Sequence, residues 1–162
     1  IWNLDEYGFV KEAAPASANP SLWRQASLNN IHGLFKVTDR VYQVRGFDLA
    51  NMTIIQGDSG LIIVDPLTAE ETAAAALALA REHLGDAPGV AVIFTHSHID
   101  HFAGIWGVTS EEDYKAGNIR VIAPEGFMEE ATSENVIAGI AMARRASFMY
   151  GRRLPRNPRG HI

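Results

Sequence analysis

The 162-residue sequence contains no cysteine, no excess of basic residues and no long apolar run. The lack of cysteine leaves the redox compartment open, because both exported and cytosolic proteins can do without the residue. A formal net charge of −5 without a basic stripe argues against a nucleic-acid partner. No apolar run approaches the ~20 residues that span a bilayer. With 47% hydrophobic residues, the composition predicts a soluble globular protein of one domain at most.

Histidine and aspartate are concentrated in one short run, Thr95–His101. The run follows Val90–Phe94, a short apolar segment that predicts a strand buried on both faces. Because side chains alternate along an extended backbone, His96 and His98 point the same way and can bind one ion. Asp100 and His101 follow where the chain should turn, which suits a second ion. Polar groups behind a buried strand need compensation for lost hydration, and a metal site provides it.

Two ions about 3.5–4 Å apart can hold a bridging water and lower its pKa toward neutrality, which supplies hydroxide for hydrolysis. Imidazole together with carboxylate favours zinc, although iron and manganese also occupy such sites. The sequence therefore predicts metal-dependent hydrolysis, with Asp100 as the candidate catalytic residue. The expected metal ligands are His96, His98, Asp100 and His101. The three isolated histidines, His32, His83 and His161, are expected to be ordinary surface or core residues.

Short strands are expected to make up the first half of the chain after residues 1–30. Residues 1–30 show no sustained period, and we expect an extended arm held by aromatic anchors. From Gly33 the pattern alternates, which predicts a meander with a hairpin loop at 57–60. The anchors are Trp2, Tyr7, Phe9 and Trp23, and the expected strands are Leu34–Val37, Val41–Arg45, Met52–Gln56 and Leu61–Asp65.

A helix is expected from Thr68, where Thr68 and Glu71 form a capping box, to a stop at Gly85. Because it leads into the buried strand, it makes a βαβ-like unit whose functional groups lie at the strand's carboxyl end. Beyond the motif, Pro and Gly positions predict further elements. These are a short helix over Phe102–Val108, a strand over Ile119–Ala123, helical residues from Pro124, and a longer helix over Thr132–Tyr150 that Gly151 ends.

The run from His96 to His101 resembles the His-x-His-x-Asp-His signature of the metallo-β-lactamase superfamily, whose fold is a sandwich of two sheets flanked by helices. Three further phrases look like the alkyl sulfatases of that superfamily, enzymes that degrade dodecyl sulfate; they lie at 44–53, 133–136 and 141–151. The likeness runs from about Trp23 to the last residue. Ile99 and Ala103 depart from the alanine and glycine of the common primary-alkyl members, which leaves the preferred alkyl sulfate open.

The resemblance implies an α/β fold, the amino-terminal half of an αββα sandwich, with 31–162 as the first part of the catalytic domain. It implies a first zinc on His96 and His98 and a second zinc on Asp100 and His101. Further ligands would come from later sequence, so the chain is expected to be an amino-terminal piece of a longer enzyme. The implied partners are an alkyl sulfate substrate, the remaining portion of the same enzyme and a second copy in a homodimer.

Asp65 and Thr95 are expected to support the ligand loop from outside the metal shell. The resemblance implies that Asp65 orients the ligands, while a simple cap of the turn at Pro66 is the alternative. Arg144 and Arg145 are either sulfate ligands or helix-surface charges. Four apolar residues nearby either line an alkyl pocket or pack in the core; they are Met142, Phe148, Met149 and Tyr150.

Other activities share the same motif and stay open. Thioester hydrolases, lactonases and mononuclear-iron persulfide dioxygenases also use His-x-His-x-Asp-His, and a piece without activity of its own is a third possibility. The chain begins at Ile1 and shows no signal peptide. By analogy we expect a periplasmic or secreted protein, with the cytoplasm as the alternative.

Overall fold

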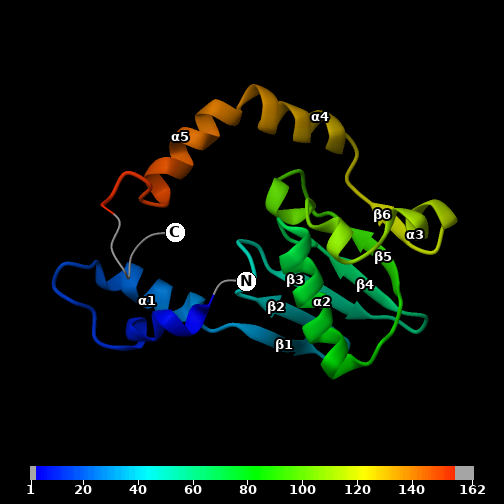
Figure 1. Ribbon diagram of the computed structural model, residues 1–162, viewed down its shortest axis with the longest axis horizontal. Helices are drawn as coiled ribbons and strands as arrows, with labels where there is room; N and C mark the ends of the chain where they lie inside the picture. Colours follow the sequence, from blue (N-terminus) through cyan, green and yellow to red (C-terminus); the bar gives the residue numbers. More distant parts are fainter. Residues whose placement is uncertain (1–2, 156–162) are drawn as a thin grey trace. The chain divides into compact units, whose positions relative to one another are not determined.

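A computed structural model describes residues 3–155 of the chain. Within these residues, one six-stranded sheet has its strands in sequence order, β1 to β6 (Figure 1). The chain divides into two compact units, and the boundary along the sequence lies between Glu125 and Gly126. The sheet and the histidine-rich run both belong to the first unit. In the described part of the chain, no helix has the length and apolar character needed to cross a membrane.

The first four strands form the predicted antiparallel meander. They are β1 (Gly33–Thr38), β2 (Val41–Arg45), β3 (Met52–Gln56) and β4 (Leu61–Val64). Val44 pairs with Met52, and Thr53 pairs with Val64, so β2 and β4 run in the same direction. The loop after β2 and the segment after β4 therefore leave the sheet at the same edge.

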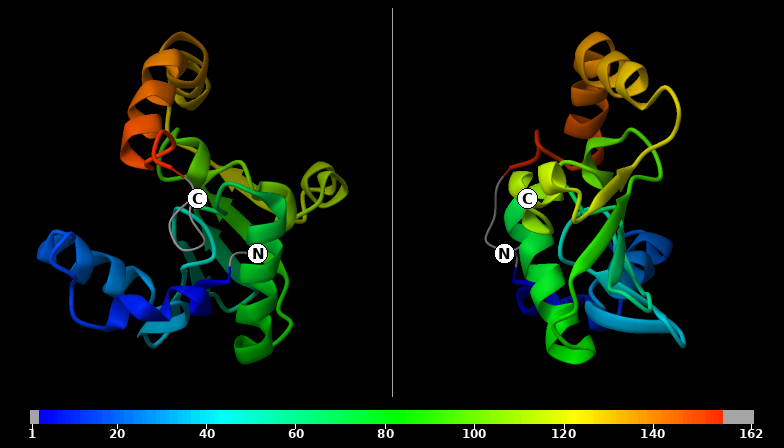
Figure 2. Two further views of the ribbon diagram at one scale, coloured as in Figure 1. Left: turned by 60° about the vertical axis from the view of Figure 1, so that its left-hand side comes forward. Right: turned by 90° about the vertical axis from the view of Figure 1, so that its right-hand side faces the viewer.

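Helix α2 (Glu70–Leu84) connects β4 to β5 (Gly89–Ile93), which lies parallel to β4. The predicted βαβ unit is thereby confirmed. Figure 2 shows α2 lying across one face of the sheet. The buried core forms between them, because small residues of the helix meet branched side chains of the strands. Fully buried members include Ala73, Ala76, Ala80, Ile54 and Ile63.

The predicted capping box of this helix is wrong. The helix begins at Glu70 after Ala69, which makes no side-chain cap, and the Thr68 hydroxyl instead donates to Asp48. The predicted end is confirmed, because Gly85 adopts φ 88° and ψ 162°. That backbone conformation is essentially restricted to glycine.

The expected extended arm is also wrong, because residues 4–29 contain two helices. These are the 3₁₀ helix η1 (Leu4–Lys11) and helix α1 (Pro20–Asn29). Phe9 lies 6.0 Å from Trp23 between ring centroids, and the Trp23 indole donates to the Glu12 carbonyl at 2.8 Å. Trp2 lies outside the described residues. The anchors thus pack on one another, and the separation of 1–30 from the catalytic domain stays a prediction.

Short elements follow β5. A 3₁₀ turn, η2 (Ile99–His101), forms within the histidine-rich run, and a second 3₁₀ turn, η3 (Ile105–Gly107), is what forms within the expected helix over Phe102–Val108. Helix α3 (Glu111–Ala116) was not expected from the sequence, and β6 (Arg120–Ile122) confirms the last expected strand. Ser110 caps α3 by accepting from the Asp113 amide at 3.1 Å.

The described part of the second unit contains three consecutive helical pieces; the first confirms the helical residues expected from Pro124, and the other two replace the one long helix expected over Thr132–Tyr150. They are α4 (Phe127–Thr132), the π-helical turn η4 (Ser133–Ile137) and α5 (Gly139–Met149). The predicted stop at Gly151 agrees with its φ of 63°. Phe148 and Met149 are exposed rather than packed in a core. His161 lies outside the described residues.

Candidate metal centre

The histidine-rich run leaves the carboxyl end of β5 beside the end of β4. Ile93 pairs with Val64, so Thr95 and Asp65 follow neighbouring parallel strands at one edge of the sheet. The ring centroid of His96 lies 4.5 Å from that of His98 and 4.1 Å from that of His101. A carboxylate joins them, since Asp100 Oδ2 lies 3.4 Å from His101 Nε2. All four predicted ligands therefore lie together.

Asp65 links this cluster to the sheet. Its Oδ1 accepts from the Thr95 backbone amide at 2.8 Å, and its Oδ2 accepts from the Thr95 hydroxyl at 2.7 Å. The same Oδ2 lies 2.9 Å from His101 Nδ1. The side chain is buried, with 8% of the residue exposed. A buried carboxylate is costly unless donors surround it, and three donors do so here.

These contacts fix where the imidazole protons lie. An ionised carboxylate only accepts hydrogen bonds, so His101 must donate from Nδ1. The Thr95 hydroxyl gives its proton to Asp65, and it can therefore only accept from His96 Nδ1 at 2.9 Å. In its neutral form, each ring then carries its proton on Nδ1 and presents the Nε2 lone pair. A lone pair on Nε2 is what metal ligation by histidine requires.

The donor set has the chemistry of a zinc site, with three imidazoles and one carboxylate. Within residues 3–155, however, no group of three or more His, Cys, Asp or Glu side chains is arranged to hold an ion. Binding by three of these donors therefore requires at least one side chain to rotate. The donor types and the tautomers fit a metal ion. The orientation of the side chains in the described residues does not bring three donors to one ion.

Asp65 is also one of two non-glycine residues with positive φ in the described chain. Its φ is 56°, and Leu67, two residues later, has φ 65°. Aspartate tolerates the left-handed region better than most residues, whereas leucine does not. Such strain persists only where the surrounding structure holds the backbone, and it concentrates at functional sites. The segment Asp65–Thr68 is therefore held in place by its contacts.

The sequence reasoning missed Asp48, which lies in the loop between β2 and β3. Asp48 accepts hydrogen bonds from Leu49, Thr68 and Thr72. Burial alone raises the pKa of Asp48, but the hydrogen bonds from Thr72 and Thr68, with those from backbone amides, outweigh it and hold the pKa below its usual value. No local spacing indicates this network, because the two threonine donors lie 20 and 24 residues away from Asp48 in the chain.

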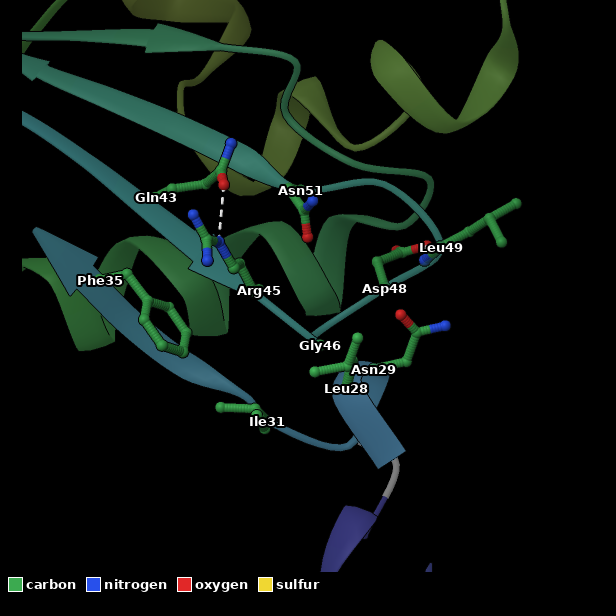
Figure 3. A pocket seen from close by; sticks show the side chains of 10 residues that line it. All are labelled: Leu28, Asn29, Ile31, Phe35, Gln43, Arg45, Gly46, Asp48, Leu49 and Asn51. Carbon is green, nitrogen blue, oxygen red and sulfur yellow. Dashed lines mark hydrogen bonds between the residues drawn. The ribbon is translucent and has the colours of Figure 1, made fainter. Parts of the chain in front are cut away.

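The same loop lines a cavity of about 690 Å³ on the first unit (Figure 3). Arg45 is fixed in it, because its Nε donates to Gln43 at 2.7 Å and its guanidinium lies 4.6 Å from the Phe35 ring centroid. Both apolar and polar residues line the rest of the wall. The lining residues are Leu28, Asn29, Ile31, Phe35, Gln43, Arg45, Gly46, Asp48, Leu49 and Asn51.

Known proteins similar to this chain include alkylsulfatases. A linear primary-alkylsulfatase from Pseudomonas sp. is 56% identical over all of this chain, which spans 24% of that protein. An (R)-specific secondary-alkylsulfatase from Pseudomonas sp. is 53% identical, again over all of this chain and 25% of the relative. The chain thus spans about a quarter of the length of these curated relatives.

A solved structure extends the likeness to three dimensions. The stereoselective inverting sec-alkylsulfatase Pisa1 from Pseudomonas sp. superposes with a TM-score of 0.86 at 55% identity, over 97% of this chain and 25% of that one. The sequence profile described as the metallo-beta-lactamase superfamily matches residues 45–158, which include the whole histidine-rich run. The chain therefore belongs to the metallo-beta-lactamase superfamily.

Proposed function

We propose that the full polypeptide hydrolyses alkyl sulfate esters to an alcohol and inorganic sulfate at a zinc centre. One observation carries the proposal: Nε2-presenting imidazoles lie with Asp100 at the strand edge of a chain that is 53–56% identical to alkylsulfatases throughout. Primary and secondary alkylsulfatases are about equally similar to it, so the preferred alkyl sulfate is left to the assay.

His96, His98, Asp100 and His101 would hold the metal. Bound zinc supplies a Lewis acid and a water of lowered pKa, the chemistry that hydrolysis of a sulfate ester needs. The roles of the other residues follow from their contacts. Asp65 keeps the His101 proton on Nδ1, and Thr95 does the same for His96, because its hydroxyl donates to Asp65 and accepts from His96 Nδ1. These four ligands supply part of a binuclear set, and we propose that further ligands come from sequence outside residues 1–162.

Release of inorganic sulfate from dodecyl sulfate by the purified full polypeptide tests the proposal. The assay is run beside thioester and lactone substrates, with metal content measured on the same sample. We expect sulfate release and bound zinc. Turnover of the thioester or lactone alone, or a single bound iron with persulfide oxidation, would contradict the proposal in favour of another activity of the superfamily.

His98→Ala tests the assignment of the ligands. Loss of an outer partner of a metal ligand typically costs 10–100-fold, so loss of a ligand should lower kcat/KM by at least about 100-fold. His83→Ala is the matched control, because His83 is an exposed residue of α2 whose Nδ1 contacts the Leu79 carbonyl of the same helix. Equal activity of the two variants would remove His98 from the site.

A further inference from the structure

Asp48 gathers four hydrogen bonds into one carboxylate. Oδ1 accepts from the Leu49 amide at 2.6 Å and from the Thr68 hydroxyl at 2.7 Å. Oδ2 accepts from the Thr68 amide at 3.2 Å and from the Thr72 hydroxyl at 2.5 Å. The loop between β2 and β3 is thereby tied to the segment that enters α2. Figure 3 shows Asp48 on this loop, at the rim of the cavity.

The segment that Asp48 holds is the one that carries Asp65. Asp65 and Leu67 both have positive φ, so the backbone here returns to ordinary conformations unless both ends are held. The end nearer the sheet is held by the bond from the Asp65 amide to the Ile93 carbonyl, at 2.9 Å. The other end is held at Thr68, through both its amide and its hydroxyl, by Asp48.

The histidine-rich run rests on the same segment from the other side. The Gly104 amide donates to the Leu67 carbonyl at 2.9 Å, three residues after His101. A shift of Leu67 and Thr68 would therefore act on His101 in two ways. It would move the Asp65 carboxylate that faces His101 Nδ1, and it would move the backbone that follows the ring.

We propose that Asp48 is a positioning residue for the metal centre, which fixes Thr68 and so keeps Asp65 aimed at Thr95 and His101. The inference rests on the zinc-binding part of the proposed function and is independent of the substrate. The hydrogen bonds of Asp48 come from Leu49, Thr68 and Thr72, and its effect on the ligands passes through Thr68, Asp65 and then His101. Its hydrogen bonds come from neutral hydroxyl and amide donors.

Asp48→Asn in the full polypeptide tests the proposal. The amide keeps one acceptor oxygen and places its NH₂ group against the Leu49 amide or the Thr68 amide, depending on its orientation, and neither backbone amide can accept a hydrogen bond. Outer partners of ligands cost 10–100-fold in metal affinity, and Asp48 is one step further out, so we expect zinc to bind about 3–10-fold more weakly. Asp58→Asn is the matched control; Asp58 is exposed and pairs with Arg40 on the hairpin loop. It should leave zinc affinity within about twofold.

A second pair of variants keeps the test valid if Asp48→Asn folds poorly. Thr72→Val removes one donor at nearly constant shape and should weaken zinc binding. Thr72→Ser keeps the hydroxyl and should retain the zinc affinity of the wild type. A metal-independent readout accompanies them: the ¹⁵N shifts of the His101 ring in metal-free protein should move toward a mixture of tautomers in Asp48→Asn and Thr72→Val only.

The outcomes separate this inference from the proposed function. Unchanged zinc affinity and unchanged His101 shifts in Asp48→Asn, with a lower stability to urea, would show a merely structural carboxylate and overturn the inference. Absence of zinc binding by the wild type would overturn it as well. Weaker zinc binding in Asp48→Asn would support the inference even if the wild type released no sulfate. The lack of sulfate release would contradict only the proposed substrate.

Discussion

Asp65 shows how one residue can serve the backbone and the site together. Its side chain is buried and charged, and its backbone is left-handed. Each property is unfavourable alone, and each is offset by the same contacts. The three donors compensate the lost hydration, and the β4–β5 pairing holds the backbone. The sequence indicated that Asp65 was either a ligand-orienting group or a turn cap; the contacts to Thr95 and His101 favour the first, and its role in catalysis stays a prediction.

Asp65→Asn should separate orientation from packing, because the two side chains have the same shape. The single acceptor oxygen of asparagine can pair either with the Thr95 amide or with the Thr95 hydroxyl and His101 Nδ1, so its NH₂ group faces a donor in both orientations. The acceptor that sets the His101 tautomer is therefore no longer fixed. We expect zinc affinity to fall about 10–100-fold, and the free energy of unfolding to fall by about 1–3 kcal/mol. Zinc competition titration and urea unfolding measure the two effects. Asp39→Asn, at an exposed turn, controls for loss of a carboxylate, and equal affinities in the two variants would contradict the assignment.

What the sequence revealed at the residue scale depended on distance along the chain. The four ligands lie within six residues, so their spacing alone predicted a metal site. Asp65 is 30 residues from Thr95, and it was found because strand ends of a βαβ unit meet at one edge. Asp48 reaches Thr68 through the packing of a loop against a helix start. Neither periodicity nor a motif reports such a contact, and Asp48 was missed.

At the scale of elements, the strands were predicted better than the helices. The predicted bounds of β2 and β3 agree with the structure to the residue, because the side-chain direction along a strand depends on the strand itself. The helix start at Thr68 failed because Asp48 captured the hydroxyl that a cap would use. The start of helix α1 could have been predicted from the sequence, because Asn followed by Pro is typical of a helix start. Asn19 caps the helix by accepting from the Ser21 and Leu22 amides, and Pro20 is its first residue.

The packing of the ligand turn against α2 depends on glycine at two places. A Cβ on Gly104 would lie 2.2 Å from the Pro66 carbonyl oxygen, and one on Gly107 would lie 2.1 Å from the Glu70 carbonyl oxygen. Backbone atoms cannot step aside as a flexible side chain does. Any side chain at Gly104 therefore pushes the turn after His101 away from the Asp65–Thr68 segment.

Gly104→Ala should destabilise the protein and weaken the metal centre together. We expect a loss of about 1–3 kcal/mol in the free energy of unfolding, the usual cost of overpacking, together with weaker zinc binding. Urea unfolding and zinc titration provide the measurements. Gly8→Ala is the matched control, because a Cβ there meets no atom within 4 Å. A Gly104 variant that binds zinc like the control would show that the ligand turn does not depend on this contact.

At the scale of the whole molecule, the two units differ in how they are stabilised. The first unit has the buried core between α2 and the sheet, whereas the helices of the second unit leave large apolar side chains exposed, among them Val136, Ile137 and Ile140 at 73%, 80% and 71%. The sequence could not predict this exposure. A regular apolar pattern indicates that a helix face is buried, but it does not indicate which part of the molecule buries it. Arg144 and Arg145 are likewise exposed, which agrees with surface charges.

Acid stability should depend on three carboxylates of the first unit. Hydrogen bonds hold the pKa of Asp48 below its ordinary value of 3.8 in spite of burial; the Arg40 guanidinium lowers the pKa of Asp58, and the side chains of Asn118 and Ser110 lower that of Asp113. A pKa lowered by folding gives stability that is complete above the unfolded value and is lost as the pH falls through the folded one. The urea midpoint of the full polypeptide should therefore fall as the pH drops below about 4.

Substitution and salt can assign that fall to its sources. Asp48→Asn should flatten the dependence by less than about 1.4 kcal/mol per pH unit, the slope of one proton. Asp58→Asn should flatten it only at low ionic strength, because salt screens its exposed pair with Arg40. The hydrogen bonds to Asp48 come from neutral donors and should contribute equally in 1 M salt. Parallel curves for wild type and Asp48→Asn between pH 2 and 5 would mean that Asp48 adds nothing to the pH dependence of stability. A difference in slope that survives salt would identify hydrogen bonds rather than ion pairs as the source of the acid dependence.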